Sequence, residues 1–420
     1  MTPPRLLMLA TPPGLGVLGG GPIVVDEMAA QLRDRGWHVE TAQGWQSVHL
    51  HSRLSRGQRW NSALSAWRKA VPDPMRRFLW YAAMPRAYYV AAAHNLVAAK
   101  RQVCDSEFDV LMVHVDGAPP GLCGLAAELA ARKSRPLVFV SLPGLAVELR
   151  AFGWAVARRI AFARLKAALP PEMFRAIPAG RVTHAVFASE SWRAQAVRAG
   201  LPPERSRTIY FGVPLPPPVP RAAAAGRRIL WVGRLSPEKG LHVLLRAMPA
   251  LLRRLPDVTV TAIVAQGSPD YRDLIERLLR ASRLEGVVAL RPPVPRAALA
   301  EAYATHDVLF FHSMFEEPVA LVLMEAFAAG LPVAASKTVS VARLVRSGET
   351  CATYDARRTE SVVHALHGIL TDGPFRERVT ANARRLVHSG FSLQAMGQSY
   401  DDLLRACMSR PPVIDAPGLA

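Results

Sequence analysis

The chain has 420 residues, which is long enough for two or three domains with sizeable hydrophobic cores. Half of the residues are hydrophobic, 20% are charged, and no apolar run is long enough to span a membrane, which excludes a disordered chain and an integral membrane protein. The formal net charge of +19 favours anionic partners, while four cysteines without metal-ligand spacing exclude a disulfide framework and favour the reducing cytoplasm.

The N-terminal region has the pattern that opens a doubly wound α/β domain. Residues 5–10 form a short apolar run, which predicts a first strand rather than a signal peptide. A loop rich in glycine and proline follows over residues 11–22, then an amphipathic helix over about 22–35 and a strand over 37–41. A glycine-rich loop that opens a helix either cradles an anion or is a plain turn. The residues alone leave both interpretations open.

Two segments combine basic and aromatic side chains. Residues 45–101 contain ten basic residues and one acidic residue, and residues 150–181 have a similar bias. This composition suits contact with an anionic membrane surface, with the rings at headgroup level; the alternative is a pair of helical regions with solvated basic faces. Nucleic-acid binding is not expected, because the chain has no nucleic-acid-binding motif.

Three further buried strands are predicted in the first half, over residues 108–117, 136–141 and 183–189. His114 stands where the first of these strands ends. Ligands of open α/β sheets lie beyond the carboxyl ends of the strands, so His114 is either a site residue or a structural histidine. Residues 214–226 are rich in proline and alanine and predict a linker between an N-terminal domain, 1–213, and a C-terminal domain, 227–391.

The second half repeats the alternation of strands and helices. Strands are predicted over residues 228–233, 258–264, 287–290, 308–311 and 332–336. Helices are predicted over residues 241–254, 270–283, 296–304, 359–371, 375–388 and 392–408. The chain after the last helix is expected to be a frayed tail.

One stretch of the second half carries two carboxylates near a predicted buried helix. Glu317 precedes Pro318, which suits the first position of a helix, and Gly330 is a suitable helix end. Glu325 is the single charged residue within that helix, so its burial requires a partner. Eight residues of helix separate the two acids by about 12 Å, which fits two ends of one elongated polar ligand better than a shared proton.

These motifs resemble those of a known enzyme family. Residues 233–240, Gly-Arg-Leu-Ser-Pro-Glu-Lys-Gly, are similar to the Gly-Arg-x4-Lys-Gly loop of the family-4-type retaining glycosyltransferases (glycosyl transferases group 1). Glu317 and Glu325 match the E-x7-E pair of that group, and Gly19-Gly20 resembles its N-terminal loop. The resemblance implies a GT-B fold, with two doubly wound Rossmann-like domains facing a central cleft and the C-terminal segment, 392–420, packed back on the first domain.

The resemblance also implies residue roles. Arg234 and Lys239 would stabilise the diphosphate leaving group, Glu325 would hold the nucleotide ribose, and Glu317 would lie near the donor sugar. His114 would lie beside the reacting sugar. The catalytic residues expected from it are His114, Arg234, Lys239 and Glu317. The donor-binding residues expected from it are Gly19, Gly20, Gly233, Arg234, Lys239, Arg291, Glu317, Ala320, Leu321 and Glu325. No metal and no cofactor are expected beyond the nucleotide-diphosphate sugar.

The chain departs from the family pattern at a few positions around the expected donor site. Val319-Ala320 stand in place of a frequent Phe-Gly, Pro292 replaces a common glycine, and His312 replaces a proline. We therefore expect a retaining hexosyltransferase that uses a UDP- or GDP-sugar and a lipid-linked, polysaccharide or other glycan acceptor. The alternative is an inactive GT-B protein that assists an active transferase. The expected location is the cytoplasm, with peripheral contact at the inner face of the plasma membrane.

Overall fold

The computed structural model describes ten stretches of the chain, and all structural statements concern these. They are residues 2–10, 20–41, 97–114, 122–141, 183–198, 201–216, 227–267, 269–314, 320–337 and 344–409. The chain divides into two compact units. Unit 1 comprises Met1–Leu142, Val156–Thr208 and Asp401–Ala420, and unit 2 comprises Pro143–Ala155 and Ile209–Tyr400. Residues 217–226 of the predicted linker lie outside the described stretches.

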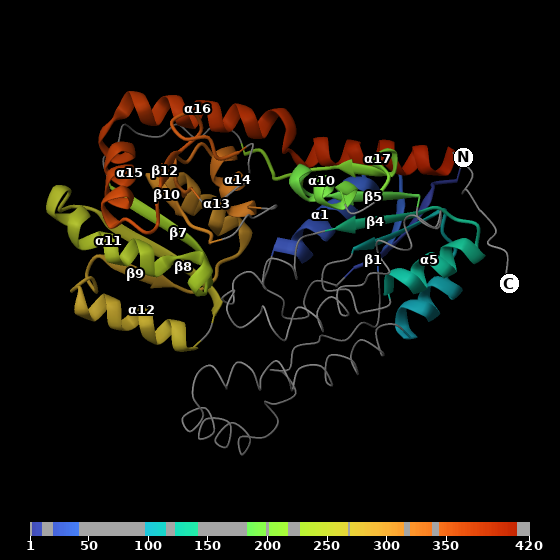
Figure 1. The fold of residues 1–420 in the computed structure, drawn as a ribbon, viewed down its shortest axis with the longest axis horizontal. Helices are drawn as coiled ribbons and strands as arrows, with labels where there is room; N and C mark the ends of the chain where they lie inside the picture. Colours follow the sequence, from blue (N-terminus) through green and yellow to red (C-terminus); the bar gives the residue numbers. More distant parts are fainter. Residues whose placement is uncertain are drawn as a thin grey trace, which may run out of the picture. The chain divides into compact units, whose positions relative to one another are not determined.

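Unit 1 contains a six-stranded sheet in the order β2-β1-β3-β4-β5-β6, in which all pairs are parallel (Figure 1). Its strands are β1 (Arg5–Leu9), β2 (His38–Thr41), β3 (Val110–His114), β4 (Leu137–Ser141), β5 (His184–Phe187) and β6 (Ser206–Thr208). Its helices include α1 (Gly20–Arg33), α5 (Leu122–Arg132) and α10 (Glu190–Arg198), and residues 97–105 are also helical.

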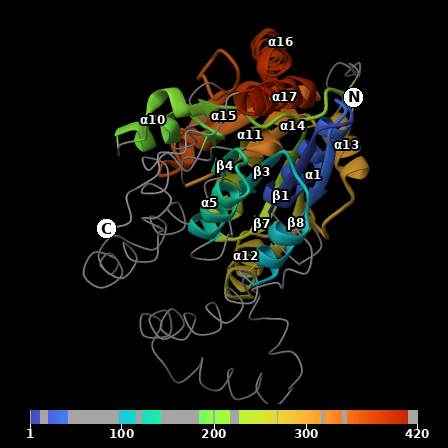
Figure 2. The same ribbon diagram turned by 90° about the vertical axis from the view of Figure 1, so that its right-hand side faces the viewer.

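Helices cover both faces of this sheet, which explains its almost continuous apolar strands. Leu7 and Leu9 of β1 belong to a core that also contains residues of α5, of α10 and of the helix at 97–105. Leu6 and Met8 alternate with them and are fully buried as well. Figure 2 shows α1 and α5 on the two sides of β1.

Unit 2 contains a second parallel sheet of six strands, in the order β12-β11-β10-β7-β8-β9. Its strands are β7 (Arg228–Leu235), β8 (Thr259–Gly267), β9 (Val288–Arg291), β10 (Val308–Phe311), β11 (Val333–Ser336) and β12 (Ala352–Tyr354). Its helices are α11 (Leu241–Arg254), α12 (Pro269–Ala281), α13 (Arg296–Thr305), α14 (Leu321–Ala328), α15 (Thr359–Thr371), α16 (Gly373–Gly390) and the first half of α17 (Leu393–Ser409).

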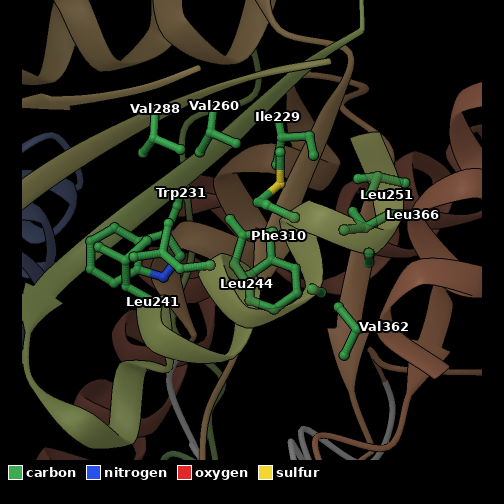
Figure 3. Close-up of a cluster of buried hydrophobic side chains, with 14 of the residues drawn as sticks. Ile229, Trp231, Leu241, Leu244, Leu251, Val260, Val288, Phe310, Val362 and Leu366 are labelled. Atoms are coloured by element: carbon green, nitrogen blue, oxygen red, sulfur yellow. The ribbon is translucent and has the colours of Figure 1, made fainter. Parts of the chain in front are cut away.

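A hydrophobic core of unit 2 lies between this sheet and helices α11, α12 and α15. Figure 3 shows part of it, with Ile229 and Trp231 from β7 beside leucines of α11 and with Leu366 from α15. Helix α11 is strongly amphipathic, and its six buried side chains all belong to this core. Burial of these apolar side chains is the main stabilising contribution in the unit, at about 1.5–3 kcal/mol for each fully buried large side chain.

Both sheets have a point where the strand order reverses, and these points position the candidate site. In unit 2, β7 lies between β8 and β10, so the loops after β7 and β10 start side by side and lead to opposite directions of the sheet. In unit 1, β1 lies between β2 and β3, so the loops after β1 and β3 also start side by side. Crevices at such switch points are where open α/β sheets bind ligands.

The predicted fold of two doubly wound α/β units is confirmed, and most predicted elements agree with the structure to within two or three residues. Two helix starts differ. Helix α1 begins at Gly20, because Pro22 fits in the first turn of a helix, where its missing N–H is not needed. Helix α14 begins at Leu321, with Ala320 as its N-cap residue, so Pro318 is not its first residue. Helix α5 and the short edge strands β6 and β12 have no counterpart in the predictions.

No helix in the described stretches is long and apolar enough to cross a bilayer.

Helix α17 begins in unit 2 and ends in unit 1, where Asp401 fixes its second half. The Asp401 carboxylate accepts a hydrogen bond of 2.6 Å from the Trp37 indole N–H and one of 2.7 Å from Arg405. The Arg405 guanidinium lies 5.6 Å from the centre of the Trp37 ring and also donates to the Arg35 carbonyl. Trp37 and Asp401 are buried, so the contact between them is shielded from water.

We expect Asp401→Ala to lower the free energy of unfolding by about 1–3 kcal/mol, because the buried Trp37 N–H would lose its acceptor. Urea unfolding followed by tryptophan fluorescence measures the change. Asp402→Ala is the matched control, because the neighbouring Asp402 side chain is exposed. Equal effects of the two substitutions would contradict the anchoring role of Asp401.

Candidate functional site

The loop between β7 and α11 carries the two cations expected at the diphosphate. Arg234 lies near the end of β7, and Lys239 lies in the short 3-10 helix formed by Pro237–Lys239. Glu238 forms an ion pair of 3.2 Å with Arg234 and accepts a hydrogen bond of 2.6 Å from the Ser236 hydroxyl. The Arg234 side chain is about half exposed, so this pair contributes little stability but holds the guanidinium in one direction.

Two hydrogen bonds from outside the loop hold its backbone in place. The Trp231 indole N–H donates to the Lys239 carbonyl at 3.0 Å, and the Met314 amide donates to the Glu238 carbonyl at 3.2 Å. The second contact joins the loop after β7 to the loop after β10. These contacts fix the backbone of Lys239 relative to the sheet.

Gly240 closes the loop in a left-handed conformation, with φ of +65°, and caps α11. A Cβ atom at this position would lie 2.1 Å from Cδ2 of His312, so the residue must be glycine for two reasons. Gly240, the N-cap of α11, has no side chain, and the His242 amide in the first turn donates to the Tyr271 hydroxyl at 3.1 Å. The positive end of the α11 helix dipole lies beside Lys239.

His312 follows β10 and packs against Gly240. Its Nδ1 lies 3.2 Å from the Tyr354 hydroxyl, which itself donates to the Phe311 carbonyl at 3.1 Å. The single Tyr354 proton is thus used, so His312 carries its own proton on Nδ1. Burial, together with the charges of His242 and Lys239, lowers the pKa of His312 to about 4. His312 is therefore neutral at pH 7.

Glu325 lies in α14, with its side chain 13% exposed. Its Oε1 accepts a hydrogen bond of 3.1 Å from Arg296, and its Oε2 accepts one of 3.0 Å from the Tyr303 hydroxyl. Burial and the adjacent Glu325 charge raise the pKa of Tyr303 well above its ordinary value, so Tyr303 remains a donor at neutral pH. The partner that a carboxylate in a buried helix requires is thus found on α13.

The start of α14 contains two of the expected donor-binding residues. Ala320 is its buried N-cap residue and Leu321 its first helical residue, and no side chain caps this end. Glu317 lies in 315–319, outside the described stretches. The beginning of its loop is fixed, because Ser336 at the end of β11 donates to the Ser313 carbonyl at 3.0 Å and accepts from the Ser313 amide at 3.3 Å.

Gly233 and Arg291 are two further residues that were expected to bind the donor. Gly233 lies in β7, where a Cβ atom would touch the Trp231 ring at 3.3 Å and approach Lys239. Arg291 ends β9 and lines a groove of about 570 Å³ with Pro292, Ile263 and residues of α13. Arg291 pairs with Ile263 of β8, which pairs with Val232 of β7, so it lies at the same carboxyl edge of the sheet as the cation loop.

In unit 1, His114 ends β3 and is 1% exposed. Neither of its ring nitrogens has a hydrogen-bond partner in the part of the chain that the structure describes. Burial lowers the pKa of His114 to about 4, so the ring is neutral at pH 7. Gly20 is the first residue of α1, and Gly19 lies outside the described stretches. The buried His114 imidazole, without a partner among the described residues, is costly to the fold unless another group bonds to it.

Several residues of the site carried no sequence signal. Glu238, Trp231, Tyr354, Arg296 and Tyr303 were not predicted, because their contacts join separate elements. His312 was recognisable only as a departure from the family pattern. No group of three metal-ligating side chains occurs within the described ranges.

We expect Gly240→Ala to lower the thermal unfolding midpoint by about 2–8 °C, since a left-handed alanine costs about 1–2 kcal/mol and its Cβ would clash with His312. The double variant Gly240→Ala/His312→Ala removes the clash and should recover part of the loss. Gly286→Ala is the control, because its Cβ would meet no atom within 4 Å. An effect of Gly240→Ala no larger than that of the control would show that this loop is not constrained.

We expect His114 to make folding less stable in acid. The folded pKa of about 4 lies below the ordinary value of 6.5, so only the unfolded chain takes up this proton between these values. Stability is thus lost as pH falls from about 6.5 to 4, by up to about 3 kcal/mol for this group. Urea unfolding at pH 7.5 and 4.5 should show a smaller loss for His114→Gln than for the natural chain. An identical loss would contradict the burial of a neutral imidazole.

The comparisons with known proteins agree with this geometry. The family model described as Glycosyl transferases group 1 matches residues 220–386. Among curated relatives, the phosphatidyl-myo-inositol mannosyltransferase of Mycolicibacterium smegmatis is 28% identical over 385 residues, which are 90% of this chain and 88% of the relative. The D-inositol 3-phosphate glycosyltransferase of Thermobifida fusca is 32% identical over 237 residues, and this match spans about half of each chain, 51% and 53%.

Solved structures show the same fold at lower identity. Anabaena HepE in complex with UDP and glucose has a TM-score of 0.64 at 17% identity, covering 96% of this chain and 99% of that one. Sucrose-phosphate synthase from Thermosynechococcus elongatus has a TM-score of 0.69 at 17% identity, covering 97% and 99%. The chain therefore has the GT-B fold of these glycosyltransferases, and its residues 220–386 match the family model of the glycosyl transferases group 1.

Proposed function

We propose that this protein transfers a hexose from a nucleotide-diphosphate sugar to a lipid-linked or other glycan acceptor, with retention of anomeric configuration and without a metal ion. The observation that carries the proposal is the pairing of two loops at the switch point of unit 2. The loop after β7 supplies Arg234 and Lys239, and the chain after β10 leads into α14 with Glu325.

The cation loop suits departure of a nucleoside diphosphate. Negative charge grows on the diphosphate as its bond to the sugar breaks, so cations held there stabilise the transition state more than the ground state. Arg234 offers a planar fork and Lys239 a point charge, and the start of α11 adds the positive end of its helix dipole. Because the loop is fixed by Trp231 and Gly240, these donors need little rearrangement during the reaction.

The acids suit the other parts of the donor. Glu325 would accept hydrogen bonds from the ribose hydroxyls. The backbone N–H groups at Ala320 and Leu321 would face the diphosphate, and Glu317 would bind hydroxyls of the donor sugar. HepE was solved with UDP and with glucose, which supports a nucleotide donor of the same class for this chain. UDP and GDP are both candidates, because both present the same ribose and diphosphate.

The acceptor side of the proposal rests on unit 1 and on the relatives. The full-length match is to an enzyme named for mannosyl transfer to phosphatidyl-myo-inositol, which supports a lipid-linked acceptor. Contact of residues 45–101 and 150–181 with an anionic membrane surface belongs to the same proposal. His114, neutral and without a partner among the described residues, would donate or accept a hydrogen bond at a hydroxyl of the reacting sugar.

A screen of UDP- and GDP-sugars, with release of the nucleoside diphosphate as readout and phosphatidylinositol vesicles or a soluble polyol phosphate as acceptor, tests the proposal. We expect Lys239→Ala to lower kcat by about 10²–10³-fold, because one preorganised donor to the leaving group is lost. Lys337→Ala, an exposed lysine at the end of β11, should keep normal activity. NMR of the product anomer tests retention.

Full activity of both Lys239→Ala and Glu325→Ala would contradict the assigned roles. An inactive partner protein should neither turn over nor bind any nucleotide sugar in calorimetry, so the same measurements distinguish that alternative. Activity that requires an added divalent cation after chelation would contradict the metal-free mechanism.

A further inference from the structure

Arg296 and Tyr303 lie on one face of α13, seven residues and about two helical turns apart. From there each contacts a different oxygen of Glu325 in α14, at 3.1 and 3.0 Å. Four of the six intervening residues are alanines. The Glu325 carboxylate is thus fixed in position and in rotation about its last bond.

This arrangement is hard to explain by stability alone. Arg296 occupies the first turn of α13, where the helix dipole disfavours a cation. Tyr303 is 3% exposed, so its hydroxyl has been withdrawn from water. Replacement of such a buried polar cluster by apolar residues is often neutral or stabilising. A functional use of the oriented carboxylate is the better explanation.

We infer that Arg296 and Tyr303 are positioning residues that orient Glu325 toward the ribose of the donor nucleotide. The inference rests on the proposed function, in which Glu325 binds the ribose. A carboxylate has about four acceptor positions, so two bonds to α13 are compatible with acceptance of ribose hydroxyls. Because its rotamer is already fixed, Glu325 loses less conformational entropy when the nucleotide binds. Arg296 contributes a charge-assisted bond, and Tyr303 contributes a directional bond without adding charge.

The test compares nucleotides that differ only in the groups Glu325 would hold. Calorimetry of the full chain measures the affinity for UDP and GDP, and for the 2′,3′-dideoxy form of each. We expect Tyr303→Phe and Arg296→Gln to weaken ribonucleotide binding by about 3–10-fold and to leave dideoxynucleotide binding unchanged. In a Glu325→Ala background, Tyr303→Phe should cause no further loss.

Two controls separate positioning from general damage. Thr305→Val removes a hydroxyl from the same helix, where it bonds to the Glu301 carbonyl, and Arg280→Gln removes an arginine from α12. Both should bind ribonucleotides normally. The two test variants probe different oxygens of Glu325, so poor folding of one, detected by circular dichroism, leaves the other as the test.

The inference is overturned if the test variants bind all nucleotides normally, or if they weaken ribo- and dideoxynucleotides equally. If the natural chain binds UDP or GDP with no preference over the dideoxy form, the donor assignment stands and the ribose role of Glu325 fails. If the natural chain binds neither diphosphate, the proposed function itself fails together with this inference.

Discussion

The pairing of β7 with β10 is the constraint on which the candidate donor site depends. These parallel strands are neighbours in the sheet but lie about 80 residues apart in the chain, with Ile229 opposite Val308. Their carboxyl ends are therefore adjacent, and the loops that follow them are joined by the hydrogen bond from the Met314 amide to the Glu238 carbonyl. One loop brings cations and the other leads to carboxylates. An elongated ligand with an anionic end and a polyhydroxyl end matches this distribution.

Backbone constraint, more than surface ion pairing, keeps the cation loop in place. The Arg234–Glu238 pair is solvent-accessible and weak, and it can exchange for a diphosphate at little cost. The contacts that set the loop are buried: Trp231 on the Lys239 carbonyl, and His312 against Gly240. His312 replaces the proline expected there from the family and takes over a packing role. It stays neutral beside Lys239, so it does not add a second cation next to the first.

Helices α13 and α14 provide a comparable constraint for the acid. Glu325 would be an expensive residue in an otherwise apolar helix, and Arg296 and Tyr303 together make it tolerable. The structural and functional explanations of this carboxylate are therefore compatible rather than exclusive. In unit 1, the His114 ring has no such hydrogen bonds from described residues.

The sequence by itself determined the elements and the motif residues. Apolar runs, prolines and glycines have local consequences, so α11 was predicted at its observed bounds, and Gly330 ends its helix with φ of +67° as expected. The spacing of Arg234 and Lys239 and of the two glutamates indicated the resemblance to glycosyl transferases group 1, whose family model matches residues 220–386. Tertiary structure alone decided the strand order, the partners of Glu325 and the need for glycine at position 240. Those features depend on contacts between residues far apart in the chain, such as Tyr303 with Glu325 and His312 with Gly240, and no local pattern encodes them. Short edge strands such as β12 form only because a neighbouring strand supplies their hydrogen bonds.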